Sequence, residues 1–408
     1  MAGFNQTDLI SDFNINSLTF FLFSLSSIVF VRLTQGYRVQ SYTLFLLNAF
    51  FMALVCSTLK EILFVFGMLI TLYTMGTLDE RIQNKKGVYQ LYAVIGLWTF
   101  LFLCKDPQLF SHFNPFSFIS IKVIGLSYLI FRGISYLFEK EFVPHKKNFI
   151  HFVNYMLFFP TIVSGPIERF SHFSKTRDVK SPPSLDIIVQ SIQRILNGMI
   201  KKFVLADNLM SFGIFSLSEN PDASVFMLWV GSFIMLFLIY LDFSGYCDMM
   251  LGIARLMGFE LIENFNAPFI SKNIQEFWTR WHISLGSIIQ DYIFTPLNKH
   301  VVTHLKKKWH FCFMIFIYLF SMILVAMWHG TTLGFLVFGT VHGTALVLFQ
   351  IKRKFFKKHA IHPSSTTSKM SLYTWRLLTY SFISFSLILW YGSFSMAIQT
   401  YKKLLGFI

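Results

Sequence analysis

FCFMIFIYLFSMILVAMWHGTTLGFLVFGTVHGTALVLF, residues 311–349, contains two apolar runs on either side of the tetrapeptide Met-Trp-His-Gly at 327–330. The runs, 311–327 and 332–349, approach the roughly 20 residues of a transmembrane helix. They therefore predict a helical hairpin in a membrane, and Gly330 allows a close turn of the backbone between its helices. An ionisable group at membrane depth is costly and usually faces a protein interior or a wet cavity, so His329 is a candidate functional residue.

The composition of the whole chain also indicates a membrane protein. Hydrophobic residues make up 54% of the 408 residues and charged residues 13%, whereas soluble domains carry about 25% charged residues. Several apolar runs are shorter than a full span, so some helices are expected to be tilted or re-entrant. We expect an all-α integral membrane protein with about 9–11 transmembrane helices. The candidate spans are 17–31, 41–57, 61–77, 89–104, 117–137, 149–163, 187–205, 223–241, 311–327, 332–349 and 372–392.

The net charge of +15 reflects orientation in the membrane and does not indicate nucleic acid binding. Lys and Arg gather in short loops between spans, and such loops stay cytoplasmic. Residues 1–16 hold no Lys or Arg, and no cleavage site follows the first apolar run, so we expect no signal peptide. We expect residues 1–16 to face outward because of how Lys and Arg are distributed over the loops that follow. The loops at 32–40, 78–88 and 138–148 are then cytoplasmic and hold Arg32, Arg38, Arg81, Lys85, Lys86, Lys140, Lys146 and Lys147, against Lys60 and Lys105 in the alternate loops.

A second histidine, His282, ends the stretch Ser271-Lys-Asn-Ile-Gln-Glu-Phe-Trp-Thr-Arg-Trp-His282. Ser271 is the expected N-cap, and Glu276 and Arg280 are spaced to pair on one helix face. Taken alone, this pattern also fits an interfacial helix with tryptophans at headgroup depth. The surrounding region, 242–297, is rich in polar residues and glycine, and such backbone at membrane depth must be buried in protein or line a cavity. We therefore expect a functional site in this region.

Other polar positions have both a structural and a functional interpretation. The segment Phe158–Arg169 ends a span abruptly at two prolines and a glycine, either as a helix terminus or as a turn beside a tunnel. Asp242 and Asp248 follow the span at 223–241 and are expected to cap it and orient a polar network, with substrate binding as the alternative. His342 is expected to be a hydrogen-bonded imidazole at a small-residue packing site.

Motifs of several other enzyme classes are missing from the sequence. There is no Walker loop, no Gly-Xaa-Ser-Xaa-Gly and no His-Glu-Xaa-Xaa-His, and the Cys and His spacings give no zinc site, so no metal is expected. Two histidines without an evident nucleophile favour direct general-base transfer. The alternative is a transporter or flippase that relays protons through the histidines.

From Phe159 to Gly343 the chain resembles the membrane-bound O-acyltransferase family, in the bacterial branch that modifies envelope polymers. The N-terminal spans fit the same architecture. The resemblance rests on Phe159-Pro-Thr-Ile-Val-Ser-Gly-Pro-Ile-Glu-Arg169, Asp242-Phe-Ser-Gly-Tyr246, Glu263-Asn-Phe-Asn-Ala-Pro-Phe-Ile-Ser-Lys-Asn-Ile-Gln-Glu-Phe-Trp-Thr-Arg-Trp-His-Ile-Ser-Leu285, Asp291-Tyr292, Trp328-His-Gly330 and Gly339-Thr-Val-His-Gly343.

Two subfamilies of this branch share these motifs. The Pro-Thr-Xaa-Xaa-Ser-Gly-Pro-Ile run, the Pro-Phe-Xaa-Xaa-Lys-Asn-Ile run and the short chain favour the D-alanyl transfer proteins of teichoic acid modification. Asp242-Phe-Ser-Gly-Tyr and Trp-His-Ile-Ser-Leu are instead typical of the alginate O-acetylation proteins. The chain departs from the family at Gln290, where Arg is usual, and at Asn298-Lys299, where the acetylating branch has a glycine pair.

The resemblance implies one integral membrane domain over 1–408, with its helices around a central tunnel. Its parts would be N-terminal spans at 1–150, a catalytic core at 151–350, and a basic loop with C-terminal helices at 351–408. His329 matches the catalytic histidine and would act as general base, while His282 would hydrogen-bond the carbonyl oxygen or orient the acyl group. The residues expected along the substrate tunnel are Asn273, Trp278, Arg280, Trp281, Asp291, Trp328, Ser164 and Asp242.

The resemblance also implies the partners and the location. No cofactor would be bound; the donor would be an acyl thioester, on the phosphopantetheine of a cytoplasmic acyl carrier protein or on coenzyme A as acetyl-CoA. The acyl group, D-alanyl in preference to acetyl, would pass to a hydroxyl of an envelope polymer or of an extracytoplasmic acyltransferase-like partner. Besides membrane lipid no further partner is expected, and the protein would be a multi-pass protein of the bacterial inner (cytoplasmic) membrane.

Overall fold

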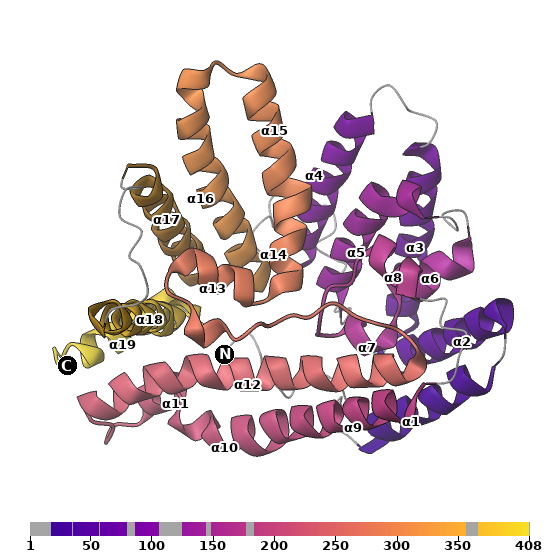
Figure 1. Cartoon of the computed structure of the whole chain (residues 1–408), viewed down its shortest axis with the longest axis horizontal. Coiled ribbons are helices and arrows are strands. Elements are labelled where there is room, and N and C mark those ends of the chain that lie inside the picture. The colour runs from indigo at the N-terminus through magenta and orange to yellow at the C-terminus, as the bar shows by residue number, and fades with distance from the viewer. Residues whose placement is uncertain are drawn as a thin grey trace. The chain divides into compact units, whose positions relative to one another are not determined.

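The described part of the chain is built from helices (Figure 1). The computed structural model describes residues 18–34, 36–56, 58–79, 86–105, 125–143, 148–176, 183–355 and 366–407. Within these ranges, strand-like pairing is limited to one isolated antiparallel bridge between Phe265 and Trp281. The expectation of an all-α membrane protein is therefore confirmed.

Six helices of the described residues are long and apolar enough to cross a membrane. Two shorter apolar helices, Thr19–Leu33 and Tyr92–Leu101, coincide with further candidate spans. The total of about 9–11 transmembrane helices and the central tunnel stay predictions. The six segments are Arg38–Val55, Leu59–Leu78, Val225–Met257, Lys307–His329, Leu333–Phe355 and Met370–Trp390.

The chain divides into two compact units, which we describe separately. The N-terminal unit comprises Asn5–Met199 and Tyr246–Ile262, and the C-terminal unit includes Ile200–Gly245 and Glu263–Ile408. The expectation of a single functional domain over 1–408 stays a prediction. The long helix α12 (Val225–Met257) contributes to both units.

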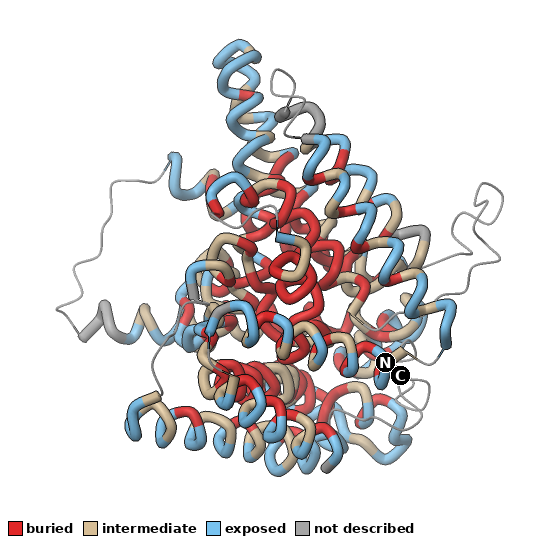
Figure 2. Tube along the Cα trace, turned by 90° about the vertical axis from the view of Figure 1, so that its right-hand side faces the viewer, coloured by how far each residue is buried: buried red, intermediate tan, exposed pale blue. Residues whose placement is uncertain are grey.

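Helices of the N-terminal unit pack around a largely aromatic core. The side chains of Phe131, Phe152, Phe159 and Phe170 are fully buried there. Along its helices, buried and exposed positions alternate, and the exposed large side chains are often apolar, as at Phe66 (Figure 2). Such faces suit contact with lipid. The helices are α1 (Leu18–Leu33), α2 (Tyr37–Val55), α3 (Leu59–Asp79), α4 (Lys86–Lys105), α5 (Leu126–Glu139), α6 (Phe149–Met156), α7 (Phe159–Ile162), α8 (Phe170–Thr176) and α9 (Leu185–Met199).

The candidate span at 149–163 is not one helix, because the chain breaks between α6 and α7. Pro160 lies in the first turn of α7, where a missing N–H is tolerated. The carbonyl groups of Tyr155 and Met156, at the end of α6, accept hydrogen bonds of 3.0 and 2.8 Å from the buried guanidinium of Arg132 on α5. A side chain far away in sequence thus stabilises a break that the apolar run concealed.

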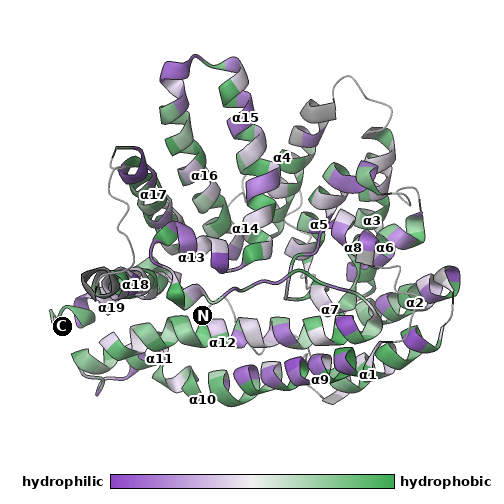
Figure 3. Ribbon diagram, viewed as in Figure 1, coloured by the Kyte–Doolittle hydropathy of each residue, from purple (hydrophilic) through white to green (hydrophobic). Residues whose placement is uncertain are grey.

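The candidate span at 187–205 forms the amphipathic α9 and the π-helical turn η3 (Ile200–Ala206). Neither element is among the six long apolar helices of the described residues. Hydrophilic and hydrophobic residues alternate along α9 (Figure 3). Its Arg194 donates to Asp248 of α12 at 3.0 Å. The pairing gives a polar side chain of this amphipathic helix a partner within the protein.

The C-terminal unit contains the hairpin that residues 311–349 predict. Helix α16 (His310–His329) runs to the turn and α17 (Leu333–Phe355) returns. The two helices pack closely at glycines: a Cβ on Gly339 would lie 2.7 Å from the Cα of Ile323. The other helices are α10 (Asp207–Leu209), α11 (Ile214–Glu219), η5 (Pro268–Ile270), α13 (Ile274–Arg280), α14 (Ile283–Ile289), η6 (Gln290–Phe294), α15 (Thr295–His304), α18 (Thr366–Ser386), η8 (Leu387–Trp390) and α19 (Phe394–Leu404).

Candidate active site

His329 is the last residue of α16, at the turn of the hairpin. Its ring centroid lies 4.4 Å from that of Trp328 and 4.6 Å from that of Trp390 in η8. The side chain is only partly buried. The hairpin therefore presents an accessible imidazole between two indole rings.

Gly330 is needed beside His329, but not for the reason expected from the sequence. Its φ of −172° is extended backbone, which any residue adopts, so no special turn conformation requires glycine. A Cβ at Gly330 would instead lie 2.2 Å from the ring of Phe335. Phe335 in turn contacts Trp390, with ring centroids 5.5 Å apart. Glycine thus leaves room for the aromatic residues that surround His329.

His282 lies within one of two short segments, 264–266 and 280–283, that pair through their backbones. The N–H of Asn266 donates to the carbonyl of Arg280, and the N–H of Ile283 donates to the carbonyl of Asn264, both at 2.9 Å. His282 itself has a φ of 47° in the left-handed region, which costs a residue other than glycine roughly 1 kcal/mol or more. The pairing on both sides maintains this strained conformation.

The imidazole of His282 is buried and fixed on one side. It is 4% exposed, and its Nδ1 lies 3.1 Å from Oδ1 of Asn264. Its Nε2 is also buried, and no described residue forms a hydrogen bond with it. Burial lowers the pKa of His282 to about 3. The ring is therefore neutral at physiological pH.

Trp328 lies between the two histidines. Its ring centroid is 5.7 Å from that of His282 and 4.4 Å from that of His329. Phe243 of α12 contacts the other side of His282, with centroids 4.8 Å apart. The residues His282, Trp328, His329 and Trp390, which we call the histidine–tryptophan cluster, are thus contiguous. They come from the start of α14, from the end of α16 and from η8.

The predicted pairing on α13 is confirmed, and the predicted cap is wrong. Arg280 forms an ion pair with Glu276 at 3.1 Å. The N-cap is Asn273, whose side chain accepts from the N–H of Glu276 at 2.9 Å, whereas the hydroxyl of Ser271 donates to the carbonyl of Pro268. Because the side chains of Asn273 and Arg280 are used in these local contacts, both stabilise the helix that precedes His282.

The other tunnel candidates on this part of the chain differ in their surroundings. Trp281 stacks on Phe277, with centroids 5.3 Å apart. Trp278 contacts the ring of His342 at 5.4 Å. Asp291 lies in η6 and is exposed. Of these candidates, Trp328 contacts both histidines and Trp281 directly precedes His282 in the chain. The role of the whole set in a tunnel stays a prediction.

His342 is hydrogen-bonded and lies at a small-residue packing site, as expected. Its Nε2 is 2.8 Å from the hydroxyl of Ser386, which itself donates to the carbonyl of Ile383. A Cβ on the neighbouring Gly343 would be 3.0 Å from the Cα of Leu319. The close approach of α16 and α17 explains this small-residue site.

The two acids after the span at 223–241 do not cap it. Helix α12 continues to Met257, so Asp242 and Asp248 lie within the helix. Asp242 forms an ion pair with Lys202 in the C-terminal unit, and Asp248 pairs with Arg194 in the N-terminal unit. The expected polar network is present, but it joins helices. Ser164 follows α7 in the N-terminal unit, so the structure gives it no position relative to the cluster.

Two residues of the site had no role in the sequence interpretation. Asn264 appears in the motif Glu263-Asn-Phe-Asn, yet only the fold places its side chain against His282. Trp390 lies far along the chain from His329 and outside every motif. The position of Asn264 in a polar stretch was the one signal that the sequence offered for it, and no local signal marked Trp390.

Comparison with known proteins gives a consistent result. The profile of MBOAT, the membrane-bound O-acyltransferase family, matches residues 8–391. A teichoic acid D-alanyltransferase of Bacillus subtilis is 30% identical over 376 residues, which are 86% of this chain and 92% of that protein. A probable alginate O-acetylase, AlgI, of Azotobacter vinelandii is 33% identical over 229 residues, 55% of this chain and 44% of that protein.

A peptidoglycan O-acetyltransferase of Helicobacter pylori is 31% identical over 263 residues, 63% of this chain and 47% of that protein. The family profile covers nearly the whole chain, and these relatives are all acyltransferases by name. The histidine–tryptophan cluster falls within the matched residues. The chain thus belongs to the membrane-bound O-acyltransferase family and is an O-acyltransferase.

Proposed function

We propose that this enzyme moves a small acyl group, D-alanyl in preference to acetyl, from a cytoplasmic thioester to a hydroxyl of a cell-envelope polymer or partner protein. The proposal rests on how much of each relative's length this chain matches. The D-alanyltransferase of Bacillus subtilis is matched over 92% of its length, whereas the alginate O-acetylase of Azotobacter vinelandii is matched over 44%. A shared architecture over nearly the whole of both chains favours a shared donor.

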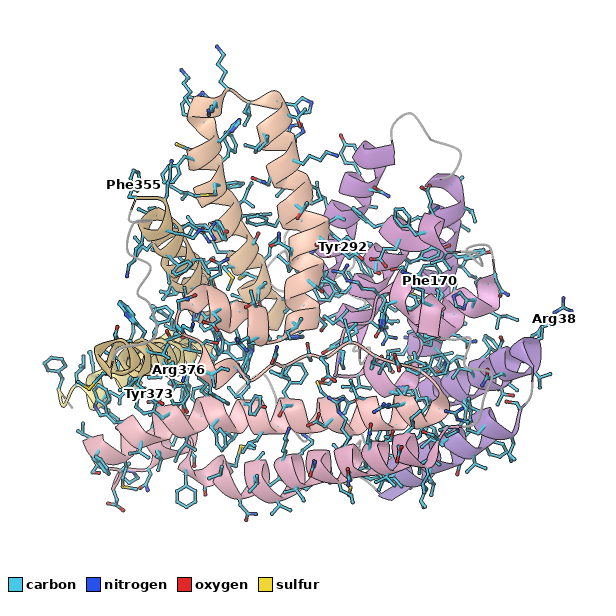
Figure 4. All side chains as sticks on the ribbon, in the orientation of Figure 1. Arg38, Phe170, Tyr292, Phe355, Tyr373 and Arg376 are labelled. Carbon is cyan, nitrogen blue, oxygen red and sulfur yellow. The ribbon has the colours of Figure 1, made fainter. Side chains whose placement is uncertain are left out.

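The α16–α17 hairpin supports opposite sides for donor and acceptor. Lys306–Lys308 precede α16, and Lys352–Lys354 end α17 beside Phe355, which is labelled in Figure 4. The Nζ of Lys354 lies 4.1 Å from the ring centroid of Phe311, so the two basic segments meet at one end. Such segments remain cytoplasmic, and the 20 residues of α16 extend about 30 Å, roughly the thickness of the hydrocarbon core. His329 would then lie near the outer face of the bacterial inner membrane.

The chemistry follows from a neutral imidazole at the place where donor and acceptor meet. His329 takes the proton of the acceptor hydroxyl as its oxygen attacks the thioester carbonyl carbon. The C–O bond forms, the C–S bond breaks, and the proton passes to the sulfur, so that an ester and a free thiol result. Base catalysis of this kind contributes about 10²- to 10⁴-fold, and holding both substrates in place contributes to the remainder. His282, whose ring contacts Trp328, assists.

The partners follow from the same arrangement. The basic cytoplasmic segments would attract an acidic acyl carrier protein or the phosphates of coenzyme A. An extracytoplasmic acyltransferase-like protein would take the acyl group or present the acceptor polymer. No cofactor is needed, because the activated acyl group arrives on its carrier.

The experiment is acyl transfer by the purified enzyme in lipid nanodiscs. The probes are D-[¹⁴C]alanyl and [¹⁴C]acetyl thioesters, each on carrier protein and on coenzyme A, with membrane vesicles containing teichoic acid as acceptor. We expect D-alanyl ester formation that depends on His329 and is retained in His304→Ala, a control at an exposed histidine of α15. Transfer of acetyl alone would overturn the proposed donor, and thioester consumption unchanged in His329→Ala would overturn the mechanism.

A further inference from the structure

The amide of Asn264 has a single orientation that satisfies its neighbours. Its Oδ1 lies 3.1 Å from the backbone nitrogen of Ser284 and 2.8 Å from the hydroxyl of the same residue. A backbone N–H can only donate, so the atom that faces it must be the amide oxygen. Asn264 is 1% exposed, and its own carbonyl accepts from the N–H of Ile283. Backbone and side chain together hold the amide oxygen in place.

This oxygen determines which nitrogen of His282 carries the proton. Nδ1 of His282 lies 3.1 Å from Oδ1 of Asn264, and an amide oxygen only accepts. Nδ1 must therefore donate. In a neutral imidazole the other nitrogen then holds a lone pair, so Nε2 is an acceptor.

The Nε2 atom of His282 is buried, and no described residue forms a hydrogen bond with it. Asn264, Phe243 and Trp328 contact the ring, and each of these three side chains is uncharged. A buried polar atom without a partner destabilises the folded protein, and functional sites are a usual place for one. The strained backbone of His282 is a second cost concentrated at this residue.

We infer that Asn264 is a positioning residue of the transfer reaction, which holds the proton of His282 on Nδ1 so that Nε2 faces the substrates as a hydrogen-bond acceptor. The inference rests on the proposed function and deepens it. Hydrogen bonding of His282 to the thioester carbonyl oxygen would need an Nε2–H, which this tautomer lacks. Nε2 instead accepts an O–H of the acceptor or an N–H of an aminoacyl group, and so orients the substrate that carries it.

A spectroscopic measurement tests the tautomer without reference to activity. The ¹⁵N spectrum of the full-length protein, labelled at histidine and reconstituted in lipid, distinguishes protonated from unprotonated ring nitrogens, and His282→Asn identifies the signals of His282. We expect a protonated Nδ1 and an unprotonated Nε2 in the wild type, and loss of this preference in Asn264→Ala. A protonated Nε2 in the wild type would overturn the inference.

Kinetics then test the role of the tautomer in transfer. Asn264→Ala should lower kcat by about tenfold or more with little change in KM, by analogy with the loss of a partner that orients a metal-ligating histidine. Asn264→Asp should restore most of kcat, because a carboxylate oxygen still accepts from Nδ1–H and from the N–H of Ser284. Wild-type kcat in Asn264→Ala, or equal losses in the alanine and aspartate variants, would overturn the positioning role.

Two controls separate this role from a general effect on folding. Asn266→Ala changes an exposed asparagine on the same segment and should leave kcat unchanged. Ser284→Ala removes one donor to the oxygen of Asn264 but keeps the backbone donor and the bond to His282, so the tautomer should persist. If the wild-type enzyme transfers no acyl group although Nδ1 of His282 is protonated, the proposed function fails and the tautomer stands. If the wild-type enzyme transfers the acyl group although Nε2 of His282 is protonated, the proposed function stands and the inferred tautomer fails.

Discussion

Substitutions at His282 can separate the donating side of its imidazole from the accepting side. The amide nitrogen of Asn can replace Nδ1 and donate to Asn264, but Asn leaves nothing at the position of Nε2. Gln reaches the position of Nε2 with its amide and leaves Nδ1 unreplaced. We expect His282→Asn to remain stable and to lose transfer, whereas His282→Ala loses both stability and transfer.

Two contributions distinguish the stabilities of the Asn and Ala variants, because both lose the ring contacts equally. The hydrogen bond to Asn264 contributes about 1 kcal/mol net. The left-handed backbone, with a φ of 47°, costs Ala about 1 kcal/mol, while Asn tolerates it. The expected difference in unfolding free energy is about 2 kcal/mol, or roughly a 30-fold change in the folding equilibrium.

Thermal unfolding in detergent measures the first expectation and radiolabelled acyl transfer measures the second. His282→Ala should unfold a few degrees below His282→Asn. Transfer should fall by about 10²-fold in both variants, with clearly more retained in His282→Gln. Equal unfolding temperatures for the Asn and Ala variants would contradict the stabilising contact with Asn264. Wild-type transfer by the Asn variant would contradict a role for Nε2 in transfer.

Other expectations follow from the hairpin and its surroundings. Gly330→Ala should lower transfer by at least about tenfold in a folded protein, because the new Cβ displaces Phe335 toward the aromatic residues around His329; wild-type kinetics would contradict this. Trp390→Phe keeps a ring beside His329 but removes the buried indole N–H, and should lower kcat by about tenfold, so an unchanged kcat would exclude a role for that N–H. In a cysteine-free background, single cysteines at 307 and 355 should react with an impermeant thiol reagent only after permeabilisation, and one at position 5 should react in intact cells; the reverse pattern would invert the orientation.

The sequence was sufficient where local patterns determine the structure. The apolar runs at 311–349 predict the α16–α17 hairpin, since a helix of that length and composition forms largely from its own residues. The four-residue spacing of Glu276 and Arg280 predicts their ion pair for the same reason. His329 could be selected because a lone ionisable group between two apolar runs is rare.

The remaining features depend on contacts between distant residues. The break after Met156 is stabilised by Arg132, and the continuation of α12 beyond 241 is stabilised in part by Arg194, neither of which a local pattern reveals. The left-handed conformation of His282 depends on pairing with the segment at Asn264. Trp390 belongs to the site only because η8 packs against the hairpin.

The central claim is that His329 takes the proton of the acceptor hydroxyl. The most direct measurement is single-turnover transfer from a D-[¹⁴C]alanyl thioester by wild type and His329→Ala at equal amounts of folded, membrane-inserted protein. We expect the first-order rate of ester formation to fall by about 10²-fold or more in the variant, with binding of the thioester retained. A rate within a few-fold of the wild type, in a well-folded variant, would contradict it.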